Sequence, residues 1–136
     1  MNHPSVDLQK AVYSALIANT SLITALGGTK IFDHNPQKAA FPYLVIGQAT
    51  DRDWSTSSED GSEHRMIIHI WSEKSDRQEV YQLQQLVRLD LHDVQLSAQD
   101  HHLINLRHEF SEIRADPRSD TLHGIMRFRA ITEPKV

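Results

Sequence analysis

Histidine is the residue type whose chemistry stands out, because this chain of 136 residues carries nine histidines and no cysteine. Neutral imidazole binds transition metals and exchanges protons near neutral pH. His64 and His69 lie five residues apart in a stretch with strand character, so their side chains are expected on opposite faces. His101 and His102 are adjacent and diverge for the same reason, whereas His108 is expected on the face of His102 but far along the strand. The spacing therefore predicts no shared metal site.

Carboxylates offer a second kind of chemistry, because oxygen ligands suit hard cations such as Mg²⁺. Asp51 and Asp53 are separated by one residue, and with His69 they would supply the ligands of a small metal-dependent hydrolase. These aspartates lie in the acidic, serine-rich stretch at about 50–63, which favours an exposed loop over a rigid catalytic site. We expect no bound metal, and the hydrolase stays as an alternative.

Motifs for catalysis and for phosphate binding are missing from the sequence. No serine lies in a G-x-S-x-G elbow, and Gly27 and Gly28 lack the remainder of a P-loop or of a G-x-G-x-x-G fingerprint. Without cysteine, thiolate catalysis and disulfides are excluded as well. The sequence predicts a protein that is not an enzyme, with no catalytic, cofactor-binding or metal-binding residue.

The composition is typical of a globular chain. Hydrophobic residues make up 39% and charged residues 24%, and 136 residues is the size of one domain, predicted to span 1–136. Fourteen Lys and Arg against eighteen Asp and Glu give a net charge of −4, so we expect no sequence-specific binding of nucleic acid. No apolar stretch approaches the length of a membrane span and no export signal is recognised, so no membrane partner is expected.

Apolar spacing predicts two helices at the start of the chain. Apolar residues recur at helical intervals over 8–16, and Ser5 is placed to cap a helix of about 14 residues. Thr20 or Ser21 begins a second, shorter helix, and Gly27 supplies the permissive backbone that ends it. These elements form a helical unit that precedes the strands.

Strands are predicted from there to the middle of the chain. Residues 30–32 form a short extended piece, and 42–47 form a strand that begins at a proline. Residues 65–71 are apolar on both faces, which indicates a central strand covered on each side. The acidic stretch at about 50–63 is predicted as the long, mobile connection between these two strands.

One helix and one hairpin are predicted in the second half. Ser75–Gln78 has the S-x-x-Q form of a capping box, and apolar residues at helical spacing follow it over 80–91. Residues 104–110 and 122–130 alternate between apolar and polar, with a turn signal at 116–120 between them. The pattern indicates the two arms of an antiparallel hairpin.

The resulting element order is α-α-β-β-β-α-β-β. Short or polar connections between successive strands favour the α+β class, with a small antiparallel sheet flanked by helices. On the first arm of the final hairpin, we expect Ile104, Leu106 and Phe110 to share one face. The residues that we expect to be most deeply buried are Val45, Ile68, Ile70, Leu83, Val87 and Phe128.

Charge is distributed unevenly along the chain. From Asp51 to Glu63 there are five acids and one base, whereas Arg114 to Val136 holds five bases and three acids. Unlike patches on one small domain suit head-to-tail association of identical copies. We predict that these groups face each other across a subunit boundary or line its rim. The residues of this predicted interface are Asp51, Asp53, Glu59, Asp60, Arg127 and Arg129.

Several short motifs, in this order and spacing, resemble one known family over nearly the whole chain. They are Leu26-Gly27-Gly28 before Lys30-Ile31-Phe32-Asp33, the proline-led strand Phe41–Gly47, His69-Ile70-Trp71-Ser72 before the long helix, and the arginine-bearing last strand. The family is that of the small tail-completion, or tail-terminator, proteins of long-tailed bacteriophages, prophages and gene transfer agents. None of these motifs is a catalytic signature.

This resemblance implies a structural virion protein made in the bacterial cytoplasm. The family members form a ring, usually of six subunits, that caps the head-proximal end of the tail tube and joins it to the neck. The implied partners are other copies of the chain, the tail-tube protein and a neck or stopper protein. The family fold is a small antiparallel sheet flanked by helices, and the family has no catalytic residues. Besides the hydrolase, a monomeric adaptor stays open as an alternative.

Overall fold

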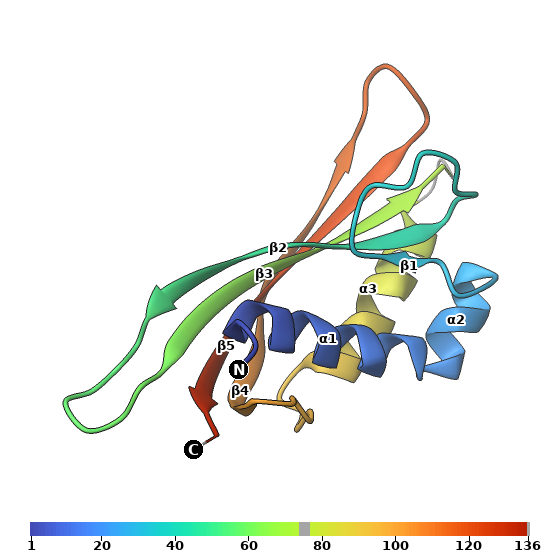
Figure 1. The fold of residues 1–136 in the computed structure, drawn as a ribbon. Helices are drawn as coiled ribbons and strands as arrows, with labels where there is room; N and C mark the ends of the chain where they lie inside the picture. The colour runs from blue at the N-terminus through green and yellow to red at the C-terminus, as the bar shows by residue number, and fades with distance from the viewer. Residues whose placement is uncertain (74–76, 136) are drawn as a thin grey trace.

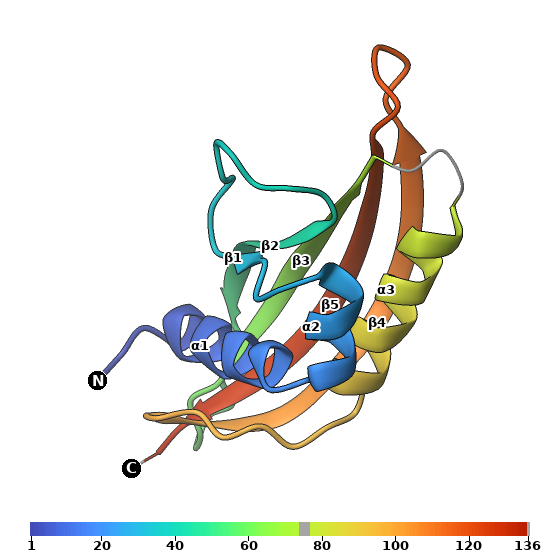
Figure 2. The ribbon, with the colours of Figure 1, turned by 90° about the vertical axis from the view of Figure 1, so that its right-hand side faces the viewer.

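A curved sheet and a layer of helices against one of its faces make up the fold (Figures 1 and 2). The computed structural model describes residues 1–73 and 77–135. Its elements are α1 (Pro4–Ile17), α2 (Thr20–Leu26), β1 (Ile31–Phe32), β2 (Tyr43–Asp53), β3 (Ser62–Ser72), α3 (Gln78–Leu91), β4 (His101–Ala115) and β5 (Leu122–Pro134). The predicted α+β class and the predicted element order are confirmed. None of the described helices is long and apolar enough to span a membrane.

The strands form one sheet in the order β1-β2-β3-β5-β4. The long strands pair antiparallel, as expected, β2 with β3, β3 with β5 and β5 with β4. The two-residue strand β1 instead runs parallel to β2, with Ile31 opposite Leu44, so the sheet is mixed. A parallel neighbour arises because the long connection over 33–42 returns the chain to the same end of the sheet before β2 begins.

The helix boundaries follow local capping chemistry, one or two residues away from the predicted caps. The N-cap of α1 is His3, whose Nδ1 accepts a hydrogen bond from the backbone N–H of Ser5, and Pro4 occupies the first turn. Asn19 caps α2 by accepting from the backbone N–H of Leu22. Gly27, with φ of 78°, ends α2 as predicted, in the left-handed conformation that favours glycine.

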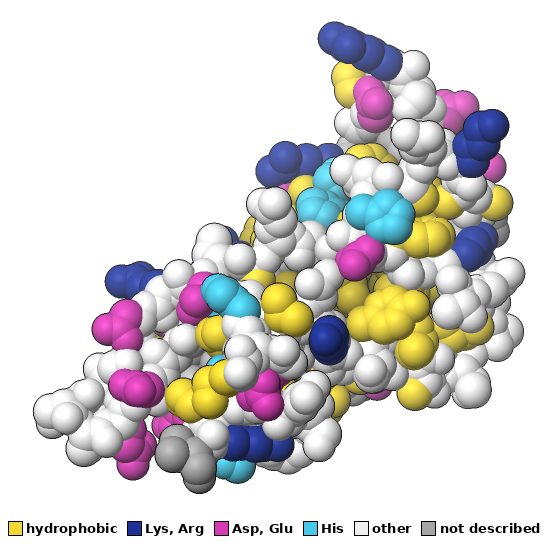
Figure 3. Space-filling view, viewed as in Figure 1, with side chains coloured by type: hydrophobic (Ala, Val, Ile, Leu, Met, Phe, Trp, Pro, Cys, Tyr) yellow, Lys and Arg dark blue, Asp and Glu magenta, His cyan; other side chains and the backbone are white. Residues whose placement is uncertain are grey.

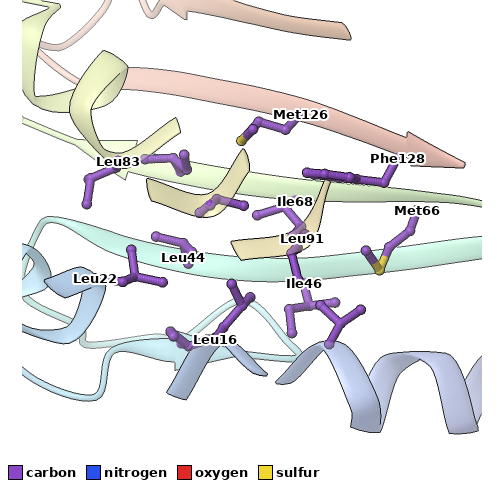
Figure 4. Packing of buried hydrophobic residues seen from close by; sticks show 14 of the residues in the cluster. Leu16, Leu22, Leu44, Ile46, Met66, Ile68, Leu83, Leu91, Met126 and Phe128 are labelled. Carbon is purple, nitrogen blue, oxygen red and sulfur yellow. The ribbon is translucent and has the colours of Figure 1, made fainter. Parts of the chain in front are cut away.

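The core lies between the sheet and the three helices of the described chain (Figure 4). All six residues predicted to be most deeply buried are at most 4% exposed. Leu83 points from α3 toward the sheet, where Ile68 and Phe128 project from β3 and β5. The predicted capping residue Ser75 lies outside the described residues, and Arg77 precedes α3 without a side-chain capping bond.

The hairpin formed by β2 and β3 is longer than predicted. Strand pairing continues to Asp53 opposite Ser62, so only 54–61 connects the two strands rather than the whole of 50–63. A register shift between Ile46 and Ala49 marks an irregularity on β2 beside Gly47. Acidic and serine-rich composition predicted a loop here, but backbone pairing with β3 stabilises Thr50–Asp53 as strand.

Two irregularities in β4 overturn the faces predicted for its side chains. Register shifts lie between Leu103 and Asn105 and between His108 and Phe110. Leu106 is buried in the core, whereas Ile104 is 45% exposed and Phe110 lies opposite Arg127 on the other face. A bulge inserts one residue and thereby reverses the alternation beyond it, so the three apolar residues do not share a face.

The helices cover only one face of the sheet (Figure 2). On the central strand β3, Met66, Ile68 and Ile70 are buried under the helices, while the alternate residues Ile67 and Trp71 are only half-buried. The position of β3 between β2 and β5 confirms the prediction of a central strand. The prediction that both of its faces are covered is wrong, since no described helix lies against the second face. That second face is called the open face below.

Candidate interaction surface

The open face carries an unusual mixture of aromatic, basic and acidic side chains. Direct cross-strand pairing places residues on the same face, so its members follow from the register of the four long strands. Its members include Tyr43, Val45, Arg52, Glu63, Arg65, Ile67, His69, Trp71, Asn105, Arg107, Phe110, Glu112, Arg114, His123, Ile125, Arg127, Arg129 and Ile131. Val45, Ile125 and Ile131 are buried there although no helix covers them. Long neighbouring side chains must therefore shield them from water.

An aromatic stack lies at the end of the open face near the start of β5. The rings of Trp71 and His123 are nearly parallel, with centroids 3.9 Å apart and an angle of 8° between planes. His69 Nδ1 lies 2.8 Å from His123 Nε2 in a hydrogen bond between the two imidazoles. Burial, aided by the nearby His69 and Arg114, lowers the pKa of His123 to about 4. Burial also lowers the pKa of His69, so both rings are neutral at pH 7.

A buried carboxylate organises the arginines at the other end of the open face. Glu63 is 4% exposed, and its two oxygens accept from Arg65 Nη1 at 2.8 Å and from Arg129 Nε at 2.7 Å. Arg52 Nε lies 3.8 Å from the same carboxylate. Burial alone would raise the pKa of Glu63, but the hydrogen bonds from Arg129 and Arg65 outweigh it and lower the pKa. Glu63 is therefore ionised at neutral pH and holds the arginines in place.

A second carboxylate extends this network. Glu109 Oε1 lies 3.1 Å from Arg127 Nε and 3.3 Å from Arg65 Nε. The guanidinium of Arg127 also lies 4.7 Å above the centre of the Phe110 ring. Four arginines thus surround two carboxylates, which leaves a surplus of two positive charges on this part of the open face.

The structure brings part of the predicted interface together within one chain. Arg129 pairs with Glu63 of its own subunit, and its guanidinium lies 5.2 Å from the centre of the Trp54 ring. Glu59, Asp60 and Arg129 line one hollow of about 290 Å³, called the hairpin hollow below. The remaining lining residues of the hairpin hollow are Trp54, Thr56, Ile104, Asn105, Ile131 and Glu133.

The other predicted acids lie exposed along the end of the β2–β3 hairpin. Asp51 Oδ2 is 3.7 Å from His3 Nε2, and Asp53 accepts a hydrogen bond from the backbone N–H of Ser55. A hydrogen bond from the Ser55 hydroxyl, followed by this backbone hydrogen bond, lowers the pKa of Asp53. Arg127 lies in mid-sheet, paired with Glu109, and not beside these aspartates. Of the two predicted basic residues, Arg129 alone therefore lies beside predicted acidic residues, namely Glu59 and Asp60.

The ligands of the alternative hydrolase are not brought together. His69 pairs with Val45 of β2, six residues from Asp51, which corresponds to about 20 Å along a strand. His64 points to the helices, where it bonds Thr132 and Ser5, while His69 points to the open face. Among residues 1–73 and 77–135, no three His, Asp or Glu side chains are grouped as metal ligands.

His101 and His102 point in different directions, as predicted, but the role of His101 was not predicted. His101 is buried and its Nδ1 lies 2.8 Å from Asp7 Oδ2, whereas His102 is exposed. Asp7 also accepts from Asn2 Nδ2 and from the backbone N–H of Asp100. Burial opposes ionisation of Asp7, but these hydrogen bonds outweigh it and lower the pKa. The network ties α1 to the start of β4, and no local pattern indicates it.

Comparison with known proteins identifies the family. Residues 10–133 match the family described as tail completion protein gp17. A chain of the solved structure named "Virion of native gene transfer agent (GTA) particle" is similar, with a TM-score of 0.86 and 24% identity over 97% of this chain and 99% of that chain. At that identity the likeness establishes a shared fold. A search of curated proteins finds no significant match. The family match covers most of the chain, so this protein belongs to the tail completion gp17 family and is a structural protein of a phage-like tail.

Proposed function

We propose that this protein forms a ring that caps the head-proximal end of a phage-like tail tube and joins the tube to the neck. The observation that carries the proposal is the family match over residues 10–133. The shared fold with a chain of a gene transfer agent virion, over nearly the full length of both chains, supports it. Six copies, a tail-tube protein and a neck protein are the proposed components of the junction.

The shape of the subunit suits a closed ring. The β2–β3 turn and the β4–β5 turn project beyond the helices at opposite ends of the sheet (Figure 1). A head-to-tail contact joins two different patches of identical copies, and it closes into a ring when the rotation between neighbours allows it. Two unlike ends on one subunit supply such patches without the self-complementary surface that a two-fold dimer requires.

Charge on the open face supports a role for the predicted interface residues. Arg127 and Arg129 each pair with one carboxylate of their own chain, and the remaining donors of their guanidinium groups can bind carboxylates of a neighbouring molecule. The exposed acids Asp53, Glu59 and Asp60 lie at the end of the β2–β3 hairpin. Because Arg129 already pairs with Glu63, we place these arginines and acids at the rim of the subunit boundary. Exposed ion pairs contribute at most about 1 kcal/mol each, so they orient the contact while apolar burial stabilises it.

Catalysis is not part of the proposed function. The family consists of structural tail proteins, and the open face separates His69 from the aspartates that the hydrolase alternative requires. A monomeric adaptor would share the fold but would lack self-association. The ring and the monomeric adaptor differ in the size of the particle that the protein forms, measured alone and together with the tail-tube protein.

Light scattering tests this proposal. The protein is measured at low and high salt, alone and mixed with its tail-tube protein, and a ring of several subunits is expected alone or on the tube. Because charge only orients the contact, raising the salt should shift assembly modestly. The Arg127→Glu variant should assemble less well than wild type, with Lys38→Glu as a matched control of equal charge change, since Lys38 is exposed and lies outside the sheet. A protein that stays monomeric under every one of these conditions would contradict the terminator function.

A further inference from the structure

One face of α3 exposes apolar side chains that nothing in the described chain covers. Tyr81 is 58% exposed and Leu89 is 67% exposed. Helical spacing places Tyr81, Gln85, Arg88 and Leu89 together on the side of α3 that faces away from the sheet. Within the described residues, Arg88 makes no ion pair. This set of four residues, called the α3 face below, combines two exposed apolar side chains with the polar Gln85 and the positive charge of Arg88.

The hairpin hollow also exposes apolar side chains, but its charge is opposite to that of the α3 face. Trp54 is 51% exposed and Ile104 is 45% exposed, and both line it. The acids Glu59, Asp60 and Glu133 surround these apolar groups, and none of the three has an ion pair in the part of the chain that the structure describes. Arg129 contributes one positive charge to the lining, so the hollow keeps an excess of negative charge.

A polar atom at the hairpin hollow also lacks a partner. Oδ1 of Asn105 is buried and accepts no hydrogen bond among residues 1–73 and 77–135. An acceptor left unpaired in a buried position costs free energy. Because this atom is covered by its own chain, the binding character of the hollow comes from its apolar walls and its excess of carboxylates. That combination fits an apolar surface carrying a guanidinium group.

We propose that the hairpin hollow of one copy binds the α3 face of a second copy. Tyr81 and Leu89 of the second copy pack against Trp54 and Ile104, and Arg88 lies among the acids of the hollow. This inference rests on the proposed function in one respect, namely that copies of the chain associate. It names the two surfaces that meet: Arg88 is the direct partner of the acids in the hollow, while Arg127 and Arg129 stay at the rim of the boundary.

The positions of the two surfaces suit a head-to-tail contact. The hollow is formed by the end of the β2–β3 hairpin together with residues of the open face, whereas α3 lies on the helix-covered face (Figure 2). In Figure 3, acidic side chains gather over the projecting β2–β3 hairpin at the lower left. Because the two surfaces do not overlap, each copy can bind one neighbour through its hollow and another through its α3 face, and such a chain of contacts closes into a ring when the rotation between neighbours allows it.

Cysteine cross-linking tests the contact directly, because the natural chain has no cysteine. Asp60→Cys and Leu89→Cys are made as separate single variants, mixed under the conditions in which wild type assembles, and oxidised. A disulfide-linked dimer should form in the mixture and not with either variant alone, because the contact joins unlike surfaces. Gln37→Cys replaces Leu89→Cys in the matched control, since Gln37 is exposed and lies in neither surface. Equal yields of the control and test dimers would overturn the proposal.

Charge reversal provides an independent readout. Arg88→Glu and Asp60→Arg should each weaken assembly by roughly tenfold, and the two changes combined in one chain should restore most of it, because the pair is reformed with reversed charge. Circular dichroism and the unfolding midpoint of each variant control for folding. If wild type assembles and the variants assemble equally well, this contact is wrong while the ring stands. If wild type is monomeric even with the tail-tube protein, both the contact and the terminator function are wrong.

Discussion

The two faces of the sheet are built in different ways. Against the helices, the face consists of aliphatic and aromatic side chains such as Ile68, Ile70 and Phe128, each no more than 1% exposed. On the open face, the buried apolar residues Val45 and Ile125 are shielded by long polar and aromatic neighbours rather than by a second layer. Helices cover one face of the sheet, whereas long side chains of the strands themselves cover the apolar residues of the other.

The helix-covered face stabilises the subunit, whereas the open face is available to bind partners. Burial of whole apolar side chains against helices contributes most of the free energy of folding. The arginine and glutamate network on the open face contributes less per residue, because part of it is exposed and screened by salt. Substitutions on the helix-covered face should therefore change the free energy of unfolding most, and those on the open face should act mainly on association.

The largest effect is expected from Leu83→Ala on the helix-covered face. Leu83 is 1% exposed in the core, and its truncation should lower the free energy of unfolding by about 2–5 kcal/mol through lost burial and a residual cavity. Denaturant unfolding measures the change. Leu89→Ala is the matched control on the same helix, since Leu89 is 67% exposed, and it should be nearly silent in the free subunit. Equal midpoints for the two variants would mean that the orientation of α3 is wrong.

A smaller loss is expected where α3 approaches β5. A Cβ added at Gly124 would lie 2.7 Å from Val80 Cγ1 and 3.2 Å from Ile70 Cβ, so α3 and the sheet are too close for a side chain there. Gly124→Ala should cost about 1–3 kcal/mol by overpacking. Thermal or denaturant unfolding measures it, and combining the change with Val80→Ala should recover part of the loss. A stable Gly124→Ala variant would contradict the close packing of these elements.

Acidification tests the aromatic stack on the open face. The pKa of His123 is lowered to about 4 from its ordinary 6.5, so between these values the unfolded chain binds a proton that the folded chain does not. The folded state therefore loses stability as the pH falls through this window, and the stabilisation is fully present above it. Melting temperatures measured from pH 7 to pH 4 should fall less steeply for His123→Gln than for wild type. Identical slopes would contradict the neutral, stacked imidazole.

The smallest effect on folding is expected from Arg127→Ala. Arg127 pairs with Glu109 and covers the Phe110 ring, but its side chain is 42% exposed, so its loss should change the free energy of unfolding by no more than about 1 kcal/mol. The unfolding midpoint at low and high salt measures this change. A loss as large as that of Leu83→Ala would contradict the contrast between the two faces.

The elements with strong local signals were predictable from the sequence. Helical spacing of apolar residues and a terminating glycine located α1, α2 and α3, and the six expected core residues are buried. The extension of β2 to Asp53 was not predictable, because pairing with β3 outweighs the loop preference of an acidic segment. The bulges of β4 were missed for a related reason, since an inserted residue changes the facing of Phe110 without a local signal.

The site was less predictable than the fold, because its contacts join residues far apart in the chain. Charge counting predicted Arg129 and the acidic hairpin as interface residues, but it did not indicate that Arg129 binds Glu63 of its own chain. The stack of His123 on Trp71 depends on the register of β3 and β5. The unlike exposed patches on α3 and at Trp54 become visible only once burial is known.

The most direct test of the central claim is electron microscopy of tail tubes assembled with and without this protein. Purified tail-tube protein is polymerised alone and in the presence of increasing amounts of the chain, and tube lengths and tube ends are recorded. If the protein caps the tube, the tubes should become shorter as its concentration rises, and ring-shaped density should occupy one end only. Unchanged tube lengths with bare ends, or density along the whole tube, would contradict a terminator.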